Sequence, residues 1–184
     1  MNFRDLSRWI RLKDDLHADC RIFEVRKSRF RRPSDQKEGD FFVLDTSDWV
    51  IVLAVTKNHE LVLVRQFRFG TEEFSLEPPG GVIEKGESPV LGGQRELLEE
   101  TGFTGKKARV IGRVYPNSAI MSNRCHFLLV EEVEKTAAPS FDPHEELETV
   151  LVPLGELKNL IKKEEITHSM ALNGIFNLLL HFGE

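Results

Sequence analysis

The sequence predicts an α/β (α+β) sandwich around one mixed sheet, and three observations carry this prediction. Strand-like apolar runs recur through the middle of the chain. Few helical patterns accompany them, one in the middle of the chain and two in its tail. The length of 184 residues suffices for one domain with an extension.

The first residues are expected to form an extension outside the main core. Residues 20–31 alternate roughly as a strand does, and residues 33–40 are polar and rich in turn-forming side chains. We therefore expect an N-terminal extension with paired strands over residues 1–38, followed by one domain over residues 39–184.

The main domain is expected to begin with strands that are joined by sharp turns. Residues 57–60 form a connection of hairpin length between two apolar runs, and the Pro-Pro-Gly-Gly sequence at 78–81 breaks the chain. The expected strands are 41–44, 49–55, 61–69, 107–115, 124–132 and 148–152, and the expected tail helices are 154–163 and 167–181.

Local signals delimit a central helix from Ser88 to Thr101. The hydroxyl of Ser88 can cap the first turn, and Pro89 suits the first helical position, where an N–H group is not needed. Gly102 stands where a left-handed residue commonly ends a helix.

This helix carries its carboxylates on one side. At 100° per residue, Glu96, Glu99 and Glu100 share an arc of about 100°. The opposite, core-facing stripe is expected to consist of Val90, Leu91, Leu97 and Leu98. A solvated acidic face is the ordinary explanation of such an arc. The alternative is a hard divalent cation, which would relieve the repulsion between the carboxylates.

The charge of the chain narrows the classes of function. Thirty Asp and Glu oppose 25 Lys and Arg, and the net charge of −5 argues against a general nucleic-acid binder. Residues 72–100 hold eight glutamates and two basic residues, so the acidity is concentrated in and just before the central helix. No apolar run approaches the roughly 18 residues of a membrane helix, and the N-terminus lacks an apolar signal core. Two cysteines do not make a disulfide framework, so a cytoplasmic location is expected.

The residues from Gly81 to Phe103 match a known pattern. Gly81 is followed after five residues by Glu87 and, after seven more, by the run RELLEETGF that begins at Arg95. This stretch resembles a complete Nudix box, with every fixed position of the 23-residue signature filled. The resemblance implies an α/β/α sandwich with a loop–helix–loop site. It also implies hydrolysis of a nucleoside diphosphate linked to another group, with Mg²⁺ or Mn²⁺ as cofactor.

The resemblance also implies roles for individual residues. Arg95 and Glu87 are similar to the ion pair that holds the loop against the helix. A diphosphate carries negative charge, which metal ions held by carboxylates neutralise while they activate water for attack on phosphorus. The positions that correspond to the family's metal site are the Gly80 carbonyl, Glu96, Glu99 and Glu100, with Glu99 as a third or outer ligand.

The segment before the box narrows the expected substrate. The run RQFR at 65–68, followed by FSLEPPGG at 74–81, resembles the branch that includes ADP-ribose pyrophosphatases and acts on nucleoside diphosphate sugars. By this likeness Arg68 would contact a phosphate or sugar, and Glu77 would be an additional carboxylate of the metal site. Arg65 is a further candidate for substrate contact.

The segment after the box departs from this branch. The run YPNSA at 115–119 stands near where ADP-ribose enzymes usually carry a Ser-Pro-Gly turn, and it offers Asn117 as a polar contact instead. A broader preference for nucleoside diphosphate sugars is therefore equally compatible with the sequence.

Two candidates are expected for the general base. Residues 131–148 are rich in Asp and Glu, and within them Glu145 and Glu146 resemble the acidic loop that supplies the base in ADP-ribose-type relatives. A nearby carboxylate can take the proton of the attacking water, whereas a solvated acidic loop is the other interpretation. The sequence does not choose between the two glutamates.

The N-terminal extension also has two interpretations. In similar hydrolases of sugar nucleotides, an N-terminal strand region crosses to a second subunit and helps to sandwich the base. Trp9 suits this role because a purine presents a flat π face, and on this interpretation the protein is a homodimer. Packing and solubility are the alternative.

The sequence as a whole favours a Mg²⁺-dependent pyrophosphohydrolase of ADP-ribose or a related nucleoside diphosphate sugar. Its products would be a nucleoside monophosphate and a sugar phosphate, and neither nucleic acid nor membrane is expected as a partner. Hydrolysis of a dinucleotide or coenzyme is the alternative within the family. A non-catalytic domain that binds a nucleotide sugar is the alternative from another class, and the complete set of carboxylates argues against it.

Overall fold

The computed structural model describes residues 6–141 and 143–183 and divides the chain into two compact units. The N-terminal unit contains the residues up to Thr46 together with the segment 117–123. The larger unit contains residues 47–116 and 124–184. In the described part of the chain, no helix is long and apolar enough to cross a membrane.

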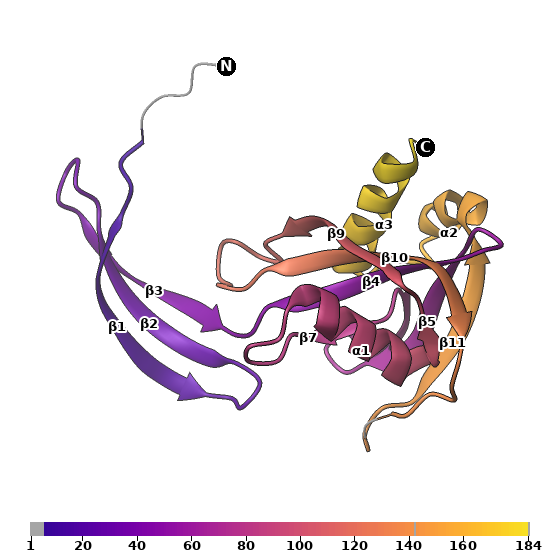
Figure 1. Ribbon diagram of the computed structural model, residues 1–184. Helices are drawn as coiled ribbons and strands as arrows, with labels where there is room; N and C mark the ends of the chain where they lie inside the picture. Colours follow the sequence, from indigo (N-terminus) through magenta and orange to yellow (C-terminus); the bar gives the residue numbers. More distant parts are fainter. Residues whose placement is uncertain (1–5, 142, 184) are drawn as a thin grey trace. The chain divides into compact units, whose positions relative to one another are not determined.

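The N-terminal unit is a three-stranded antiparallel sheet with the order β1–β2–β3 (Figure 1). The strands are β1 (Ile10–Asp19), β2 (Glu24–Arg31) and β3 (Glu38–Asp45). Paired strands are expected in this extension, but only residues 20–31 carry a strand-like pattern, and the side chains of β1 are exposed along nearly its whole length. The predicted extension of residues 1–38 covers β1 and β2, whereas β3 pairs with β2 over residues 38–45.

Polar contacts, rather than a hydrophobic core, tie these strands together. Asp14 of β1 accepts hydrogen bonds from the hydroxyl of Ser28 and, at 3.1 Å, from Nη2 of Arg26. Ser28 is almost fully buried, but the large apolar side chains Phe41 and Phe42 are about half exposed. This unit therefore buries little apolar surface of its own.

The larger unit is built on one mixed sheet. Its main path has the order β11–β5–β4–β10–β8, and β6, β7 and β9 pair with β5, β4 and β10 respectively. β10 runs parallel to β4, and the other pairs are antiparallel. The strands are β4 (Trp49–Thr56), β5 (Glu60–Arg68), β6 (Glu73–Glu77), β7 (Gly80–Val82), β8 (Phe103–Thr104), β9 (Lys107–Val114), β10 (Cys125–Lys135) and β11 (Leu147–Pro153).

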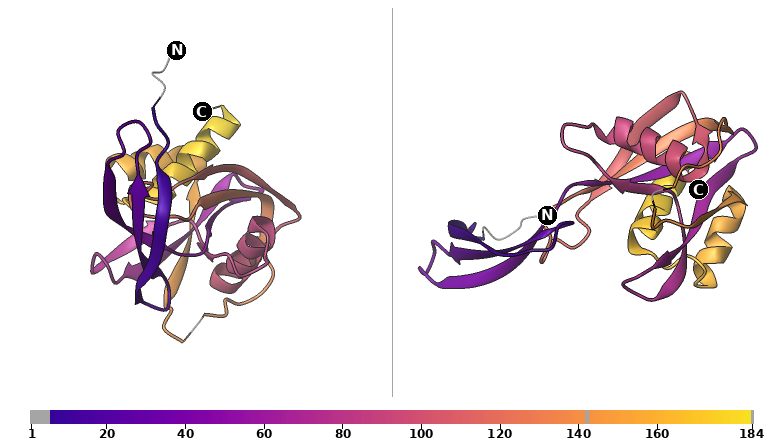
Figure 2. Two further views of the ribbon diagram at one scale, coloured as in Figure 1. Left: turned by 90° about the vertical axis from the view of Figure 1, so that its left-hand side faces the viewer. Right: turned by 90° about the horizontal axis from the view of Figure 1, so that it is seen from below.

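Helices cover both faces of this sheet (Figures 1 and 2). Alternate residues of β4 enter two separate cores: Val52 packs in the core that contains Leu97 of α1, and Leu53 packs in the core that contains Ile175 of α3. The helical elements are α1 (Pro89–Thr101), the 3₁₀ turn η1 (Leu154–Glu156), α2 (Leu157–Lys162) and α3 (Ser169–Phe182). The predicted sandwich around a mixed sheet is confirmed.

The central helix begins and ends where the sequence predicts. The Ser88 hydroxyl accepts a hydrogen bond from the N–H of Leu91 at 3.3 Å. Gly102 has a left-handed φ of 74°, and its N–H donates to the carbonyl of Leu98 at 2.8 Å. Both ends of α1 are therefore capped by the residues expected for these positions.

The predicted core-facing stripe of α1 is only half correct. Leu97 is buried and Val90 packs against the core, but Leu91 is 61% exposed and Leu98 is 39% exposed. The reason is Gly93, which takes the place of a large side chain at the contact with the sheet. A Cβ atom at Gly93 would lie 2.5 Å from Cδ2 of Leu128. The helix thus lies very close to the sheet.

We expect Gly93→Ala to destabilise the larger unit by about 2 kcal/mol, because the added methyl group overpacks the contact between α1 and the sheet. The free energy of unfolding in a denaturant titration measures this loss. Gly155→Ala is the matched control, since a Cβ at Gly155 meets nothing within 4 Å, and it should change stability by less than about 0.5 kcal/mol. Equal stability of the two variants would contradict the close packing at Gly93.

Candidate active site

Two glycines bring the strand before α1 against the acidic side of the helix. In β7, Gly80 pairs with Ile51 of β4, and a Cβ at Gly80 would lie 2.1 Å from the carbonyl oxygen of Val50. A Cβ at Gly81 would lie 2.4 Å from Oε1 of Glu96. Only residues without side chains allow the backbone to pass between β4 and this carboxylate.

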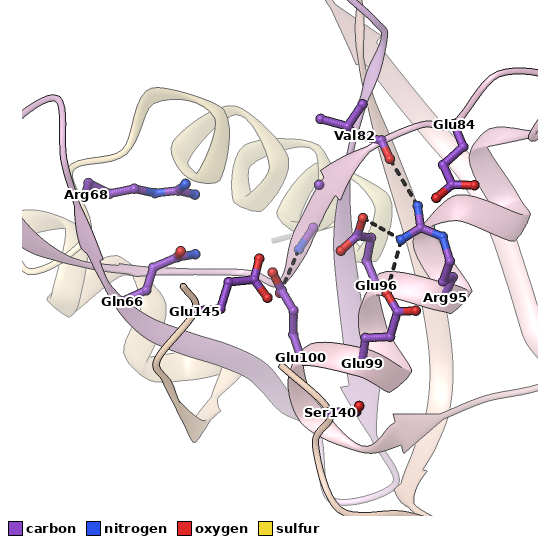
Figure 3. A pocket seen from close by; sticks show the side chains of 12 residues that line it. Gln66, Arg68, Val82, Glu84, Arg95, Glu96, Glu99, Glu100, Ser140 and Glu145 are labelled. Atoms are coloured by element: carbon purple, nitrogen blue, oxygen red, sulfur yellow. Dashed lines mark hydrogen bonds and ion pairs between the residues drawn. The ribbon is translucent and has the colours of Figure 1, made fainter. Parts of the chain in front are cut away.

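Arg95 joins the loop, the strand and the helix, and Figure 3 shows its contacts with Val82, Glu96 and Glu99. Its Nε donates to Glu87 Oε1 at 3.1 Å, and its Nη2 donates to the Val82 carbonyl at 3.1 Å. Its Nη1 donates to Glu96 at 2.8 Å and to Glu99 at 3.1 Å. The contact that the sequence predicts between Arg95 and Glu87 is present in the structure.

Glu87 is held on both sides. Besides the guanidinium, its Oε2 accepts the N–H of Glu84 at 3.0 Å, and a Cβ at Gly92 would lie 2.8 Å from the same oxygen. The hydrogen bonds from Arg95 lower the pKa of Glu87. In turn, the hydrogen bond to Glu87, and to a smaller extent the one to Glu96, raises the pKa of Arg95. The ion pair thus keeps both the carboxylate of Glu87 and the guanidinium of Arg95 charged and in fixed positions.

The acidic side of α1 faces a cavity of about 460 Å³. Figure 3 shows Glu100 and Glu145 on one side of it and the side chains of Arg68 and Gln66 beyond them. The residues that line the cavity are Gln66, Arg68, Gly80, Gly81, Val82, Glu84, Arg95, Glu96, Glu99, Glu100, Ser140 and Glu145. Most of the sequence-predicted residues thus surround one space.

The deepest carboxylate of this cavity belongs to Glu100, which is 5% exposed. Burial raises the pKa of Glu100 to about 8, against the opposing effect of a hydrogen bond from the Gly80 N–H at 3.1 Å. The neighbouring carboxylates of Glu96 and Glu145 raise it further. Burial also raises the pKa of Glu96, although Arg95 opposes this. Ionisation of the carboxyls at the inner end of the cavity is therefore disfavoured in the absence of a compensating cation.

The donor set fits a hard divalent cation, which prefers carboxylate oxygens. Within the residues that the structure describes, however, no three His, Cys, Asp or Glu side chains are grouped closely enough to hold one ion. Arg95 engages Glu96 and Glu99, and the Gly80 N–H engages Glu100. Coordination of a cation would thus require rotation of these glutamate side chains.

Glu77, a predicted carboxylate of the metal site, does not line the cavity and is fully buried. Its Oε1 accepts from Arg68 Nε at 2.8 Å and lies 2.6 Å from Arg68 Nη2, and its Oε2 lies 2.9 Å from Nδ1 of His168. Burial raises the pKa of Glu77, but the contacts with His168 and Arg68 outweigh it, so the pKa lies below its ordinary value. Both oxygens are thus occupied by basic side chains.

The structure separates the two candidates for the general base. Glu145 lines the acidic cavity, and its charge acts on Glu96 and Glu100. Glu146 does not line this cavity but borders a second one of about 970 Å³, which Glu145 also borders. The sequence leaves these two residues equivalent, and the cavity distinguishes them.

Three other predicted contact residues lie elsewhere. Arg65 borders the second cavity, where its guanidinium lies 4.2 Å from the centre of the Phe74 ring. Trp9 belongs to the N-terminal unit and packs edge-on against Phe41 at 5.8 Å. Asn117 belongs to the same unit, where its Oδ1 accepts the N–H of Ala119 at 3.2 Å.

The structure adds residues to the site that the sequence did not single out. Gln66 stands inside the RQFR run, so the motif itself could have indicated it. Glu84 lies in the loop of the box without a fixed motif position. No local sequence pattern indicates that Ser140 belongs to the site. It reaches the cavity because its N–H donates a hydrogen bond to the carbonyl of Glu99 at 2.8 Å. His168 is more than 90 residues from Glu77 in sequence, and only folding brings the two together.

Comparisons with known proteins agree with this geometry. The family model described as NUDIX domain matches residues 46–171. An ADP-ribose pyrophosphatase of Bacillus subtilis is 36% identical over 118 residues, which are 64% of this chain and 64% of that protein. The ADP compounds hydrolase NudE of Escherichia coli is 24% identical over 127 residues, which are 69% of this chain and 67% of that protein.

A solved structure supports the fold. The crystal structure of an ADP compounds hydrolase superimposes on this chain with a TM-score of 0.85 at 20% sequence identity. The superposition covers 98% of this chain and 99% of the hydrolase chain.

We expect Arg95→Met to destabilise the larger unit by about 2 kcal/mol, because it removes charge-assisted hydrogen bonds from a partly buried set of carboxylates. The matched control is Arg109→Met, which breaks an exposed ion pair with Glu131 at 2.7 Å and should cost less than about 1 kcal/mol. Denaturant titrations of both variants give the comparison. A loss at Arg95 no larger than that at Arg109 would contradict the role of Arg95 as the residue that joins loop, strand and helix.

Proposed function

The chain belongs to the NUDIX family, whose domain model matches residues 46–171, and from this premise we propose that it hydrolyses nucleoside diphosphate sugars. The substrate is ADP-ribose or a related compound, and the products are a nucleoside monophosphate and a sugar phosphate. The names of the similar ADP-ribose pyrophosphatase and ADP compounds hydrolase support an ADP-linked substrate.

One observation carries this proposal, namely the uneven charge of the 460 Å³ cavity. Five carboxylates line it, and they belong to Glu84, Glu96, Glu99, Glu100 and Glu145. The guanidinium of Arg68 borders the same cavity, whereas that of Arg95 is shared among neighbouring glutamates. A diphosphate is repelled by such carboxylates alone, so this site suits it only together with cations.

We propose Mg²⁺ as the cofactor, with Mn²⁺ as a substitute, because the donors of this cavity are oxygen atoms. Glu96 and Glu100 would hold it, with Glu99 and the carbonyl of Gly80 as further donors. When bound, the cation neutralises diphosphate charge and makes water a better nucleophile.

The remaining residues of the cavity have roles that follow from their contacts. Arg68 binds an oxygen of the diphosphate and so orients the phosphorus atom for attack. Glu145 takes a proton from the attacking water, since it borders the cavity next to Glu100. Arg95 and Glu87 keep the loop against α1, and they thereby fix the place of the carboxylates.

We propose a homodimer as the assembled state. The N-terminal sheet exposes Trp9, Phe41 and Phe42 and buries little apolar surface of its own, so a second copy would supply the cover that it lacks. In such a dimer Trp9 would offer a π face to the base. A cytoplasmic location belongs to the same proposal and is supported by free thiols at Cys20 and Cys125.

The experiment that tests the function is a panel of ADP-ribose, ADP-glucose, GDP-mannose and UDP-glucose, assayed with Mg²⁺ and with the products identified. Release of a nucleoside monophosphate and a sugar phosphate supports the proposal. Hydrolysis of a dinucleotide or coenzyme in place of these compounds would move the substrate class within the family. Binding of a nucleotide sugar without turnover would indicate a sensor.

We expect Glu100→Gln to reduce Mg²⁺-dependent release of the nucleoside monophosphate by about 100-fold or more, because the amide is a poor ligand for a hard cation. Without added metal, this variant should be at least as stable as the parent, since a neutral amide replaces a buried carboxylate near Glu96 and Glu145. Rates and thermal midpoints measured on the same preparations separate the two effects. Turnover at the parent rate would show that the metal assignment is wrong.

We expect Glu145→Gln to lower kcat by about 100-fold and Glu146→Gln to leave it within about threefold, because only Glu145 borders the acidic cavity. The two variants are matched in chemistry and adjacent in sequence, so general effects on the loop are shared. Steady-state kinetics on the best substrate of the panel measure the difference. A larger loss at Glu146 would assign the base to the other glutamate.

A further inference from the structure

A chain of three side chains runs from the N-terminus of α3 to the acidic cavity. His168 contacts one oxygen of Glu77, and Arg68 contacts the other oxygen and borders the cavity. Of the three residues, only Arg68 lines the cavity, so any effect of His168 on a substrate there would pass through Glu77 and Arg68.

We propose that His168 is a positioning residue, which holds Arg68 in the orientation that meets the diphosphate by fixing the buried carboxylate of Glu77. This inference rests on the proposed function, because it takes Arg68 as the contact for a phosphate. It concerns the geometry of one guanidinium and not the chemistry of the reaction.

The position of His168 is itself well fixed. It directly precedes α3, and Ile166 and Met170, two positions before and after it, are buried in the hydrophobic core. Its side chain makes no capping hydrogen bond to the helix and turns to Glu77 instead. The backbone that carries the imidazole is thus anchored independently of the cavity.

The contact with Glu77 requires a hydrogen on Nδ1. A carboxylate only accepts hydrogen bonds, so an imidazole nitrogen 2.9 Å from Oε2 must carry the hydrogen. At 2.9 Å the two atoms are within hydrogen-bond distance of each other, and in the described part of the chain neither has another partner. The contact holds Oε2 away from Arg68 and leaves Oε1 for the guanidinium.

The burial of Glu77 makes this arrangement sensitive to the loss of one partner. Its side chain has no exposure, so water does not replace a lost contact at Oε2. Without His168 the carboxylate would turn both oxygens toward Arg68, and the guanidinium would be drawn toward β6 and away from the cavity. We therefore expect a weaker hold on the diphosphate, with KM affected more than kcat.

Two substitutions at the same position isolate this effect. Asparagine places an amide N–H close to the position of Nδ1, whereas serine is too short to reach Glu77, and both are favoured residues before a helix. We expect His168→Ser to raise KM about tenfold, and we expect His168→Asn to stay within about threefold of the parent, because only asparagine keeps the donor. His181→Asn, on the same helix, is the control that should leave KM unchanged.

A double-mutant cycle tests whether His168 acts through Arg68. In an Arg68→Met background, His168→Ser should have no further effect on kcat/KM, because the guanidinium that it positions is absent. If His168→Ser costs the same factor in both backgrounds, or if serine and asparagine lose activity equally, the positioning role is overturned.

A readout without turnover separates this inference from the proposed function. The Nε–H signal of Arg68 in a ¹⁵N spectrum, assigned by its loss in Arg68→Met, should be ordered in the parent and in His168→Asn and mobile in His168→Ser. If the chain fails to hydrolyse any sugar nucleotide but shows this pattern, the function fails and the positioning role stands. An equally ordered signal in His168→Ser would overturn the positioning role whatever the activity.

Discussion

The acidic side of α1 depends on one guanidinium. Arg95 spans the loop, β7 and the helix at once, and it reduces the repulsion between carboxylates that would otherwise push the loop from the helix. Because Glu96 and Glu99 share this single cation, their negative charge is only partly balanced. The same contact thus stabilises the loop–helix segment and leaves the cavity ready for a cation from solution.

Glycine residues allow the close packing around the segment of β7 and α1. Gly93 allows α1 to approach the sheet, and Gly80 and Gly81 allow β7 to pass between β4 and Glu96. Burial of Glu100 follows from these approaches, and with it the raised pKa of that carboxyl. Glycine in a helix interior costs roughly 1 kcal/mol relative to alanine, so the charged cavity is obtained at the expense of helix stability.

The sequence predicts most where the signals are local. The caps Ser88 and Gly102 and the spacing of the box place α1 and its carboxylates correctly. The sequence does not predict contacts between distant segments, because these form only when the chain folds. Examples are the approach of Ser140 to the cavity, the contact of His168 with Glu77 and the different surroundings of Glu145 and Glu146. Helical periodicity also does not predict the exposure of Leu91 and Leu98, because it does not show that a glycine faces the sheet.

The N-terminal unit is assembled from two separate stretches of chain. Residues 117–123, which lie between β9 and β10 in sequence, meet β3 where the N–H of Leu44 donates to Ile120 and the N–H of Ser122 donates to Leu44. Removal of the first 46 residues would leave the carbonyl of Ile120 and the N–H of Ser122 without these partners. The N-terminal unit is therefore completed by a loop that lies more than 70 residues away in the sequence.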